Sequence, residues 1–176
     1  MKYNNPVRIF VLVLALAFAF AAFAPGTAKA ASEKEEGPSI VGVAASVNQQ
    51  SGEFSTLIAA LKAAGLVKKF DTKGNFTVFA PTDAAFAKLG LNAENVGSLP
   101  KAKLMKILGY HVTRGDRYAQ GVVGSSRLRM LSGDYTSVNL KSDGAFLDQS
   151  KIVTTNIKAN NGVIHIIDTV LLPPAD

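Results

Sequence analysis

The 176-residue chain contains no cysteine and no tryptophan, and it has only two histidines. Without cysteine the fold has no disulfides and no thiolate ligands for zinc, and it lacks the lipobox cysteine through which bacterial lipoproteins are anchored. Two histidines without acids clustered at ligand spacing give no support for a metal site, so we expect neither metal nor cofactor. With no tryptophan and only four tyrosines, the chain offers few aromatic rings for stacking on sugars or bases. These absences favour a fold that is held together by packing alone.

Sequence motifs of catalysis are missing as well. We find no glycine-rich phosphate loop, no Gly-x-Ser-x-Gly nucleophile turn and no paired-cysteine metal motif. An acid such as Asp83 would need a nucleophile and a second partner in one cleft to act in catalysis, and the sequence names neither. We therefore expect a binding protein and not an enzyme.

The first thirty residues have the pattern of a secretory signal peptide. Lys2 and Arg8 give a positive start, residues 9–24 carry no polar side chain, and residues 28–30 (Ala-Lys-Ala) form a small-x-small cleavage site. An uncleaved membrane anchor is the rival interpretation, but the apolar run is shorter than the ~20 residues of a spanning helix. We expect residues 1–30 to be removed and the remainder to be secreted or periplasmic, without a stable membrane span.

Much of the positive charge belongs to this leader. The whole chain has 19 basic and 13 acidic residues, whereas the part after residue 30 has 16 and 13, a net charge of +3. A protein that binds nucleic acid is expected to carry a stronger, clustered basic face, so we expect no nucleic-acid partner. Residues 31–37 are charged and lack apolar anchors, which is typical of a flexible arm, and residues 38–174 have the length of one domain.

Apolar periodicity predicts helices first and strands later. Helical spacing is seen over residues 40–47, 54–66, 84–89 and 100–108, with Gly65 and Gly109 as expected helix ends. One early β-rich run covers residues 76–80, and five later ones cover residues 127–131, 135–140, 145–147, 151–154 and 162–166, with a last at 170–172. This order predicts a single α+β domain.

The chain resembles a fasciclin domain, also called FAS1 or beta-Ig-H3, of the single-domain secreted bacterial type. The segment Thr77–Asp83 with Phe86 resembles the first sequence box of that family, and Asn161–His165 with Asp168 resembles the second. Tyr110-His111 resembles its Tyr-His motif. The resemblance extends from residue 37 to residue 174.

The resemblance implies a β-sandwich or wedge-like sheet core with an N-terminal helical cap. It also implies a module of cell adhesion, or of contact with the cell envelope or extracellular matrix, that meets a protein or glycan through an exposed sheet face or loop. Some fasciclin-like proteins carry carotenoids in water, so the alternative is a water-soluble carrier of an apolar ligand, a carotenoid or a lipid. The oligomeric state stays open.

Three segments are candidates for binding. The resemblance links Tyr110-His111 to integrin contact, although a pair of rings at a helix end can equally fill the core and satisfy buried carbonyls. Arg114-Gly115-Asp116 is an integrin-type tripeptide, and the alternative is an ordinary polar turn. Asn156-Ile157 occupies the place where some relatives carry Asp-Ile; here the asparagine lacks the carboxylate that an integrin metal site would bind.

The residues of the two sequence boxes have structural explanations. Thr82 or Asp83 can cap the helix that carries Phe86, because a short oxygen side chain accepts from free N–H groups of the first turn. Asn161-Gly162 is turn chemistry. Strand alternation places the neighbours of His165 on the opposite face, and the ring can donate to a backbone carbonyl or to a carboxylate such as Asp168 or Asp83.

Four arginines lie close together in the sequence: Arg114, Arg117, Arg127 and Arg129. Alternation puts Arg127 and Arg129 on one strand face. Such a cluster can meet an anionic polysaccharide or lipid headgroups, and the alternative is a solvated sheet face.

Overall fold

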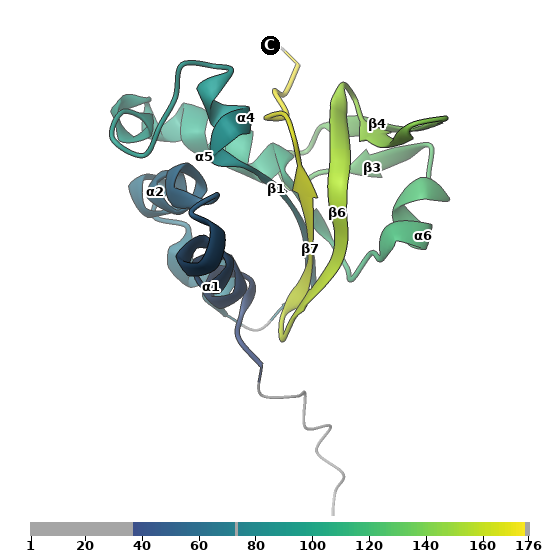
Figure 1. Cartoon of the computed structure of the whole chain (residues 1–176), viewed down its shortest axis with the longest axis horizontal. Coiled ribbons are helices and arrows are strands. Elements are labelled where there is room, and N and C mark those ends of the chain that lie inside the picture. Colours follow the sequence, from purple (N-terminus) through teal and green to yellow (C-terminus); the bar gives the residue numbers. More distant parts are fainter. Residues whose placement is uncertain (1–36, 73, 175–176) are drawn as a thin grey trace, which may run out of the picture. The chain divides into compact units, whose positions relative to one another are not determined.

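The computed structural model describes residues 37–72 and 74–174, which lie in one compact unit (Figure 1). The predicted signal peptide (1–30) and almost all of the predicted arm (31–37) lie outside the described residues. The helices are α1 (Ile40–Ser51), α2 (Ser55–Ala64), α3 (Val67–Asp71), α4 (Asp83–Ala87), the 3-10 turn η1 (Val96–Ser98), α5 (Lys101–Tyr110) and α6 (Ala119–Val123). The strands are β1 (Phe76–Pro81), β2 (Val112–Arg114), β3 (Arg127–Arg129), β4 (Tyr135–Lys141), β5 (Gly144–Leu147), β6 (Ser150–Ala159) and β7 (Gly162–Ile167).

The early helices form a layer on one side of the sheet. In Figure 1, α1, α2, α4 and α5 lie together beside β1 and β7. The apolar stripes of these helices pack on one sheet face in a cluster that includes Leu57, Leu61, Phe86, Leu108 and Ile164. Glycines in the left-handed conformation end the first two helices, Gly52 after α1 and Gly65 after α2.

The sheet has seven strands in the order β2-β1-β7-β6-β5-β4-β3. β1 and β7 run parallel, from the pair Phe76↔Gly162 to the pair Pro81↔Ile167, while the other neighbours are antiparallel. An isolated bridge between Thr113 and Met130 brings β2, at one edge, to the residue that follows β3, at the other. The sheet therefore curves back on itself.

A second apolar cluster fills the other face of the sheet. It contains Phe79, Leu128, Leu147 and Ile167, all at most 1% exposed. All six residues of β7 are buried, so this strand has core on both of its faces. The predicted α+β fold, with a sheet core and an N-terminal helical layer, is confirmed.

Several predicted boundaries are wrong. α5 continues through Gly109 to Tyr110, so this glycine does not end the helix. It lets the backbone of Ser132 approach closely, since a Cβ at Gly109 would lie 3.2 Å from the Ser132 nitrogen. Residues 170–172 are not a strand, since the Leu171 N–H donates to the His111 ring at 2.9 Å and not to a neighbouring strand. β6 extends to Ala159 through two register shifts, beyond the predicted end at residue 154.

Two short helices were not predicted. α3 places Phe70 in the core directly after Gly65, and the lysines before it lie on its exposed side. α6 contains glycine and valine, which are poor helix formers, and its position depends on tertiary contacts: Val122 is fully buried, and the Ala119 N–H donates to the Asn156 side chain at 2.8 Å.

The two candidate cap residues of the first box serve different helices. Thr82 is the N-cap of α4, where its hydroxyl accepts from the Ala85 N–H at 3.3 Å. The Asp83 carboxylate reaches α2 and accepts from the Ser55 and Thr56 N–H groups at 3.2 and 2.8 Å. Thr82 is therefore the residue that caps the predicted helix, whereas Asp83 satisfies N–H groups at the start of α2 and joins α4 to that helix.

Asn161 joins three elements at the start of β7. Its side chain accepts from the Ile40 N–H at 2.8 Å and donates to the carbonyls of Phe70 and Thr72 at 2.7 and 2.9 Å. The next residue, Gly162, has no room for a side chain, because a Cβ would lie 2.0 Å from the Phe76 carbonyl oxygen. The Asn161-Gly162 pair therefore makes the turn and also fixes α1 and α3 to the sheet.

Asn161→Ala should lower the free energy of unfolding by about 3 kcal/mol, because it leaves buried backbone groups of α1 and α3 without partners. Asn160→Ala is the matched control; its side chain makes no recorded hydrogen bond, and we expect a loss below about 1 kcal/mol. Denaturant unfolding of both variants measures the difference. Equal losses would show that the side-chain bonds of Asn161 contribute little.

Candidate functional site

The Arg114–Asp116 tripeptide forms a fixed turn at the end of β2. Gly115 adopts a positive φ of 88°, and its N–H donates to the Asn75 carbonyl at 2.9 Å. The Thr77 hydroxyl donates to the Gly115 carbonyl at 2.7 Å and accepts from the Arg117 N–H at 2.8 Å. The backbone of the tripeptide is thus tied to β1 on both sides of Asp116.

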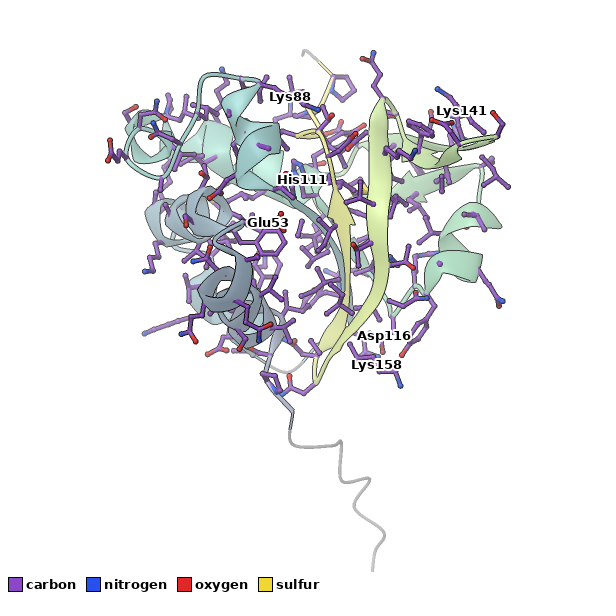
Figure 2. All side chains as sticks on the ribbon, in the orientation of Figure 1. Glu53, Lys88, His111, Asp116, Lys141 and Lys158 are labelled. Carbon is purple, nitrogen blue, oxygen red and sulfur yellow. The ribbon has the colours of Figure 1, made fainter. Side chains whose placement is uncertain are left out.

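The Asp116 side chain is exposed on this turn. One carboxylate oxygen accepts from the Asn75 amide at 3.0 Å, which orients the group and leaves further lone pairs for another donor. Figure 2 shows Asp116 and Lys158 at the same end of the sheet. Both residues line a shallow groove of about 300 Å³, together with Tyr118 and Asn160.

Tyr118 and Lys158 were not among the predicted site residues. Tyr118 is 43% exposed although it is a large aromatic residue, and Lys158 is exposed on β6. Aromatic residues are enriched at protein-binding surfaces, and polar residues form the rim around them. The position of Tyr118 two residues after the tripeptide was a sequence signal for it, whereas nothing in the sequence places Lys158 there.

The predicted pair Asn156-Ile157 lies in a bulge of β6, and its two residues have different roles. Asn156 is exposed, has a positive φ of 63° and accepts from the Ala119 N–H. Ile157 is partly buried and packs on the core beneath the helices. The bulge therefore positions α6 next to the tripeptide turn, and Asn156 is the member of the pair that a partner can reach.

The buried His165 ring bonds to the backbone of both exposed segments, the turn after β2 and the bulge of β6. The ring is fully buried, is stacked 5.5 Å from the Phe79 ring, and its Nε2 donates to the Arg117 carbonyl at 2.8 Å. Nδ1 lies 3.4 Å from the Asn156 N–H and accepts from it. Burial lowers the pKa of His165, which favours this neutral form.

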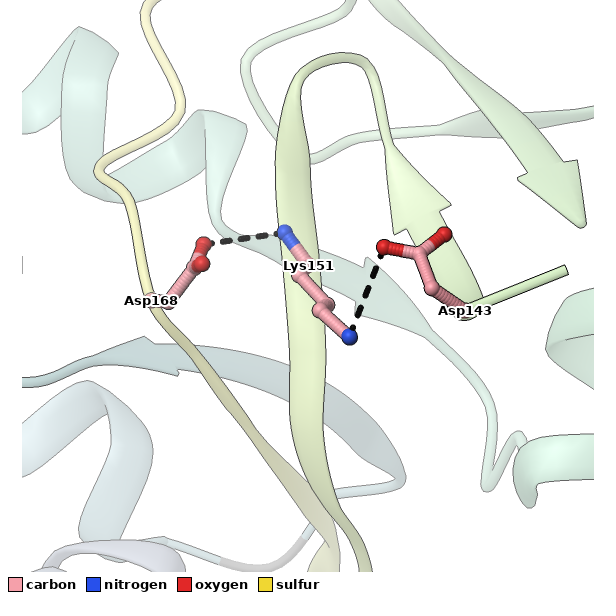
Figure 3. A network of polar contacts seen from close by, with 3 residues as sticks. All are labelled: Asp143, Lys151 and Asp168. Carbon is pink, nitrogen blue, oxygen red and sulfur yellow. Dashed lines mark hydrogen bonds and ion pairs between the residues drawn. The ribbon is translucent and has the colours of Figure 1, made fainter. Parts of the chain in front are cut away.

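Of the partners considered for His165, a backbone carbonyl is the one found. Neither Asp168 nor Asp83 contacts the ring. The Asp168 carboxylate accepts instead from the Lys151 N–H at 2.9 Å, and the Lys151 ammonium lies 3.5 Å from Asp143 (Figure 3). Asp168 thus links the end of β7 to β6 and is a structural residue.

Tyr110 and His111 do not belong to the exposed surface. Each is only 2% exposed. His111 lies between the helices and the sheet (Figure 2), where its Nδ1 donates to the Ile107 carbonyl at 2.8 Å and its Nε2 accepts from Leu171. The Tyr110 hydroxyl donates to Asp148 at 2.9 Å, and burial together with that carboxylate raises the pKa of Tyr110 to about 12. Both side chains satisfy buried polar groups.

Within residues 37–72 and 74–174, no three histidine, cysteine or acidic side chains come together as a group that could hold a metal ion. In the same part of the chain, no helix has the length and apolar character to cross a bilayer.

Comparison with known proteins agrees with this fold. The family model of the fasciclin domain matches residues 52–173. The chain belongs to the fasciclin family. It is 42% identical over 123 residues to protein sll1483 of Synechocystis sp., over 69% of this chain and 68% of that protein. It is 34% identical to the immunogenic protein MPT70 of Mycobacterium tuberculosis, over 86% of this chain and 82% of that one.

Fasciclin relatives also include longer proteins. The chain is 36% identical to the transforming growth factor-beta-induced protein ig-h3 of Sus scrofa, over 77% of this chain but only 20% of that protein. A solved FAS1 domain pair from the insect cell adhesion molecule Fasciclin I matches with a TM-score of 0.59 at 17% identity, over 77% of this chain and 51% of that one. This structural match shows the shared fold.

The buried histidines predict a loss of stability in acid. Burial lowers the pKa of His111 from 6.5 to about 4. Between pH 6.5 and pH 4 the unfolded chain therefore binds a proton at this residue that the folded chain does not bind, which stabilises the unfolded state. Stability should be unaffected by this group above pH 6.5 and should fall by about 2 kcal/mol between pH 7 and pH 5. His165 acts in the same direction.

Denaturant unfolding at a series of pH values between 7 and 5 measures this loss. In His111→Gln the amide can still donate and accept but does not titrate, so the pH dependence should be flatter by the contribution of His111. An unchanged slope in His111→Gln would mean that His111 titrates normally in the folded protein.

Proposed function

We propose that this fasciclin domain is an exported adhesion module that binds a protein or glycan of the cell surface, envelope or matrix, and that it acts without catalysis. The observation that carries the proposal is the exposed Asp116 carboxylate on a turn whose backbone is held by Thr77 and, through Arg117, by His165. A rigid turn loses little conformational entropy on binding. The insect cell adhesion molecule with the same fold supports this class of function.

The contact surface in this proposal consists of Asp116, Tyr118, Asn156 and Lys158. Tyr118 supplies a ring that can be buried against a partner, while Asp116 and Lys158 supply charges of opposite sign. Asp116 supplies the carboxylate that Asn156 lacks. An acceptor for a cationic group or a partner's metal ion is therefore present on this surface.

Adhesion to envelope preparations of the native host tests the surface. Asp116→Asn and Tyr118→Ala should each weaken binding by about tenfold, because the first removes a charged acceptor and the second an aromatic contact. Glu94→Gln is the control, since Glu94 is an exposed acid on a loop outside this surface. If both variants adhere as well as the parent and the control, this surface is not the contact.

The alternative, a water-soluble carrier of a carotenoid or lipid, rests on the apolar space between the helices and the sheet. Leu57, Phe70, Leu108 and Ile164 line a cavity there of only about 30 Å³. Binding sites for drug-sized ligands usually measure about 300–1,000 Å³. A carrier function would therefore require the helical layer to move away from the sheet, and this requirement favours adhesion.

An absorption spectrum and mass spectrometry of a solvent extract test the carrier function. The protein is purified from its native host without detergent, and we expect neither pigment nor lipid in stoichiometric amount. A stoichiometric pigment or lipid would replace adhesion by the carrier as the preferred function. Leu61→Trp, which fills the cavity, should then reduce the amount of ligand recovered.

A further inference from the structure

Three of the four clustered arginines line one groove. Arg114, Arg117 and Arg129 surround a surface hollow of about 400 Å³, with Met130 and Leu131 among its lining residues. The groove lies where the two edges of the curved sheet meet, because Thr113 bridges to Met130 and the Leu131 N–H donates to the Val112 carbonyl at 2.7 Å. It lies on the same segment as the tripeptide turn but uses different side chains.

The guanidinium groups in this groove have no anionic partner in the described part of the chain. The ion pair between Lys151 and Asp143 lies outside the groove, and no acidic residue is among the residues that line it. The Nε of Arg117 is buried and has no hydrogen-bond acceptor among the described residues. A buried donor without an acceptor is costly, so Arg117 is a cation whose surroundings lack a partner for it.

Arg127 separates from the other three. It shares the exposed side of β3 with Arg129, as the alternation predicted, but its guanidinium lies 5.2 Å from the centre of the Tyr135 ring. It does not line the groove. The sequence cluster of four arginines is therefore three groove residues and one residue stacked on a tyrosine.

Hydrogen bonds hold the backbone around the groove in place. The Thr113 hydroxyl donates to the Arg129 carbonyl at 2.8 Å and joins β2 to β3. The Thr77 hydroxyl accepts from the Arg117 N–H, and the His165 ring donates to the Arg117 carbonyl. The three guanidinium groups thus extend from a backbone that is already ordered, which lowers the entropy cost of closing them around a ligand.

We propose that this groove binds the sulfate or phosphate ester groups of an anionic polysaccharide. Guanidinium groups pair with sulfate and phosphate groups through two parallel N–H···O bonds, and three of them carry enough positive charge to engage more than one such group. The large exposed apolar side chains of the domain do not line the groove, whereas docking on a lipid surface relies on apolar side chains that insert. The site goes beyond the proposed adhesion surface, because Asp116 and Tyr118 take no part in it.

Titration calorimetry with a sulfated heparin-type hexasaccharide tests the proposal, with the desulfated hexasaccharide as the matched ligand. We expect the sulfated ligand alone to bind. Arg117→Gln and Arg129→Gln should each weaken binding by about tenfold, since each removes a charged hydrogen-bond donor. Arg127→Gln, with the same loss of charge on the same strand face, should change affinity by less than about threefold. Thermal unfolding confirms that each variant is folded, and the exposed Arg129 keeps the test decisive if Arg117→Gln unfolds.

Four results would contradict the proposed glycan site. If Arg127→Gln weakens binding as much as the groove variants do, the ligand is attracted by the net charge of the domain and not by the groove. If the sulfated hexasaccharide does not bind at all, the groove is not a glycan site. Binding to phosphatidylglycerol vesicles but not to the hexasaccharide would indicate a membrane. Binding of inorganic sulfate as tight as that of the hexasaccharide would indicate a small-anion site.

Asp116→Asn separates this site from the adhesion surface. It should leave binding of the hexasaccharide undiminished, while Arg129→Gln should reduce binding of the hexasaccharide. Loss of envelope adhesion in Asp116→Asn with intact hexasaccharide binding supports two independent sites. Loss of hexasaccharide binding in Asp116→Asn would contradict the groove as the glycan site, whatever the envelope assay gives.

Discussion

The burial of β7 on both faces is the constraint on which the rest of the domain depends. A strand with core on each side must satisfy every polar group it carries, and β7 begins beside Asn161 and contains His165. Both side chains find their partners in backbone groups of other elements. Asn161 bonds to α1 and to the end of α3, and His165 bonds to the turn after β2 and to the bulge of β6. The polar groups of one buried strand thereby position elements on every side of it.

This arrangement explains how an apparently loose surface is kept rigid. The tripeptide turn and the β6 bulge are both exposed segments, and exposed loops are usually the mobile parts of a fold. Here the buried His165 ring donates to the Arg117 carbonyl, which follows the turn, and accepts from the Asn156 N–H in the bulge. Thr77 of β1 adds two further hydrogen bonds to the turn. Surface residues near Asp116 are therefore supported from the core, as preorganised binding sites require.

The class of fold and most elements could be predicted from the sequence, whereas the contacts that make the site could not. Periodicity reveals helices and buried strands because it depends on local spacing, and α1, α2, β1 and β7 were predicted on that basis. The reach of Asp83 to α2, the hydrogen bond from Leu171 to His111 and the helix at Ala119 all depend on partners distant in sequence. The tripeptide was visible in the sequence, but Lys158 of β6 lines the same groove as Asp116 and Tyr118 only because of the tertiary fold.

The charged side chains of residues 114–117 line two different grooves. Asp116 lies in the shallow groove with Tyr118 and Lys158, while Arg114 and Arg117 line the other groove with Arg129. In a flexible loop the aspartate and the arginines would pair with one another and cancel. Here the positive φ of Gly115 turns the chain between Arg114 and Asp116, and the Asn75 amide donates to the Asp116 carboxylate. One short turn therefore contributes side chains of opposite charge to two different grooves, which is the arrangement that the two proposed sites require.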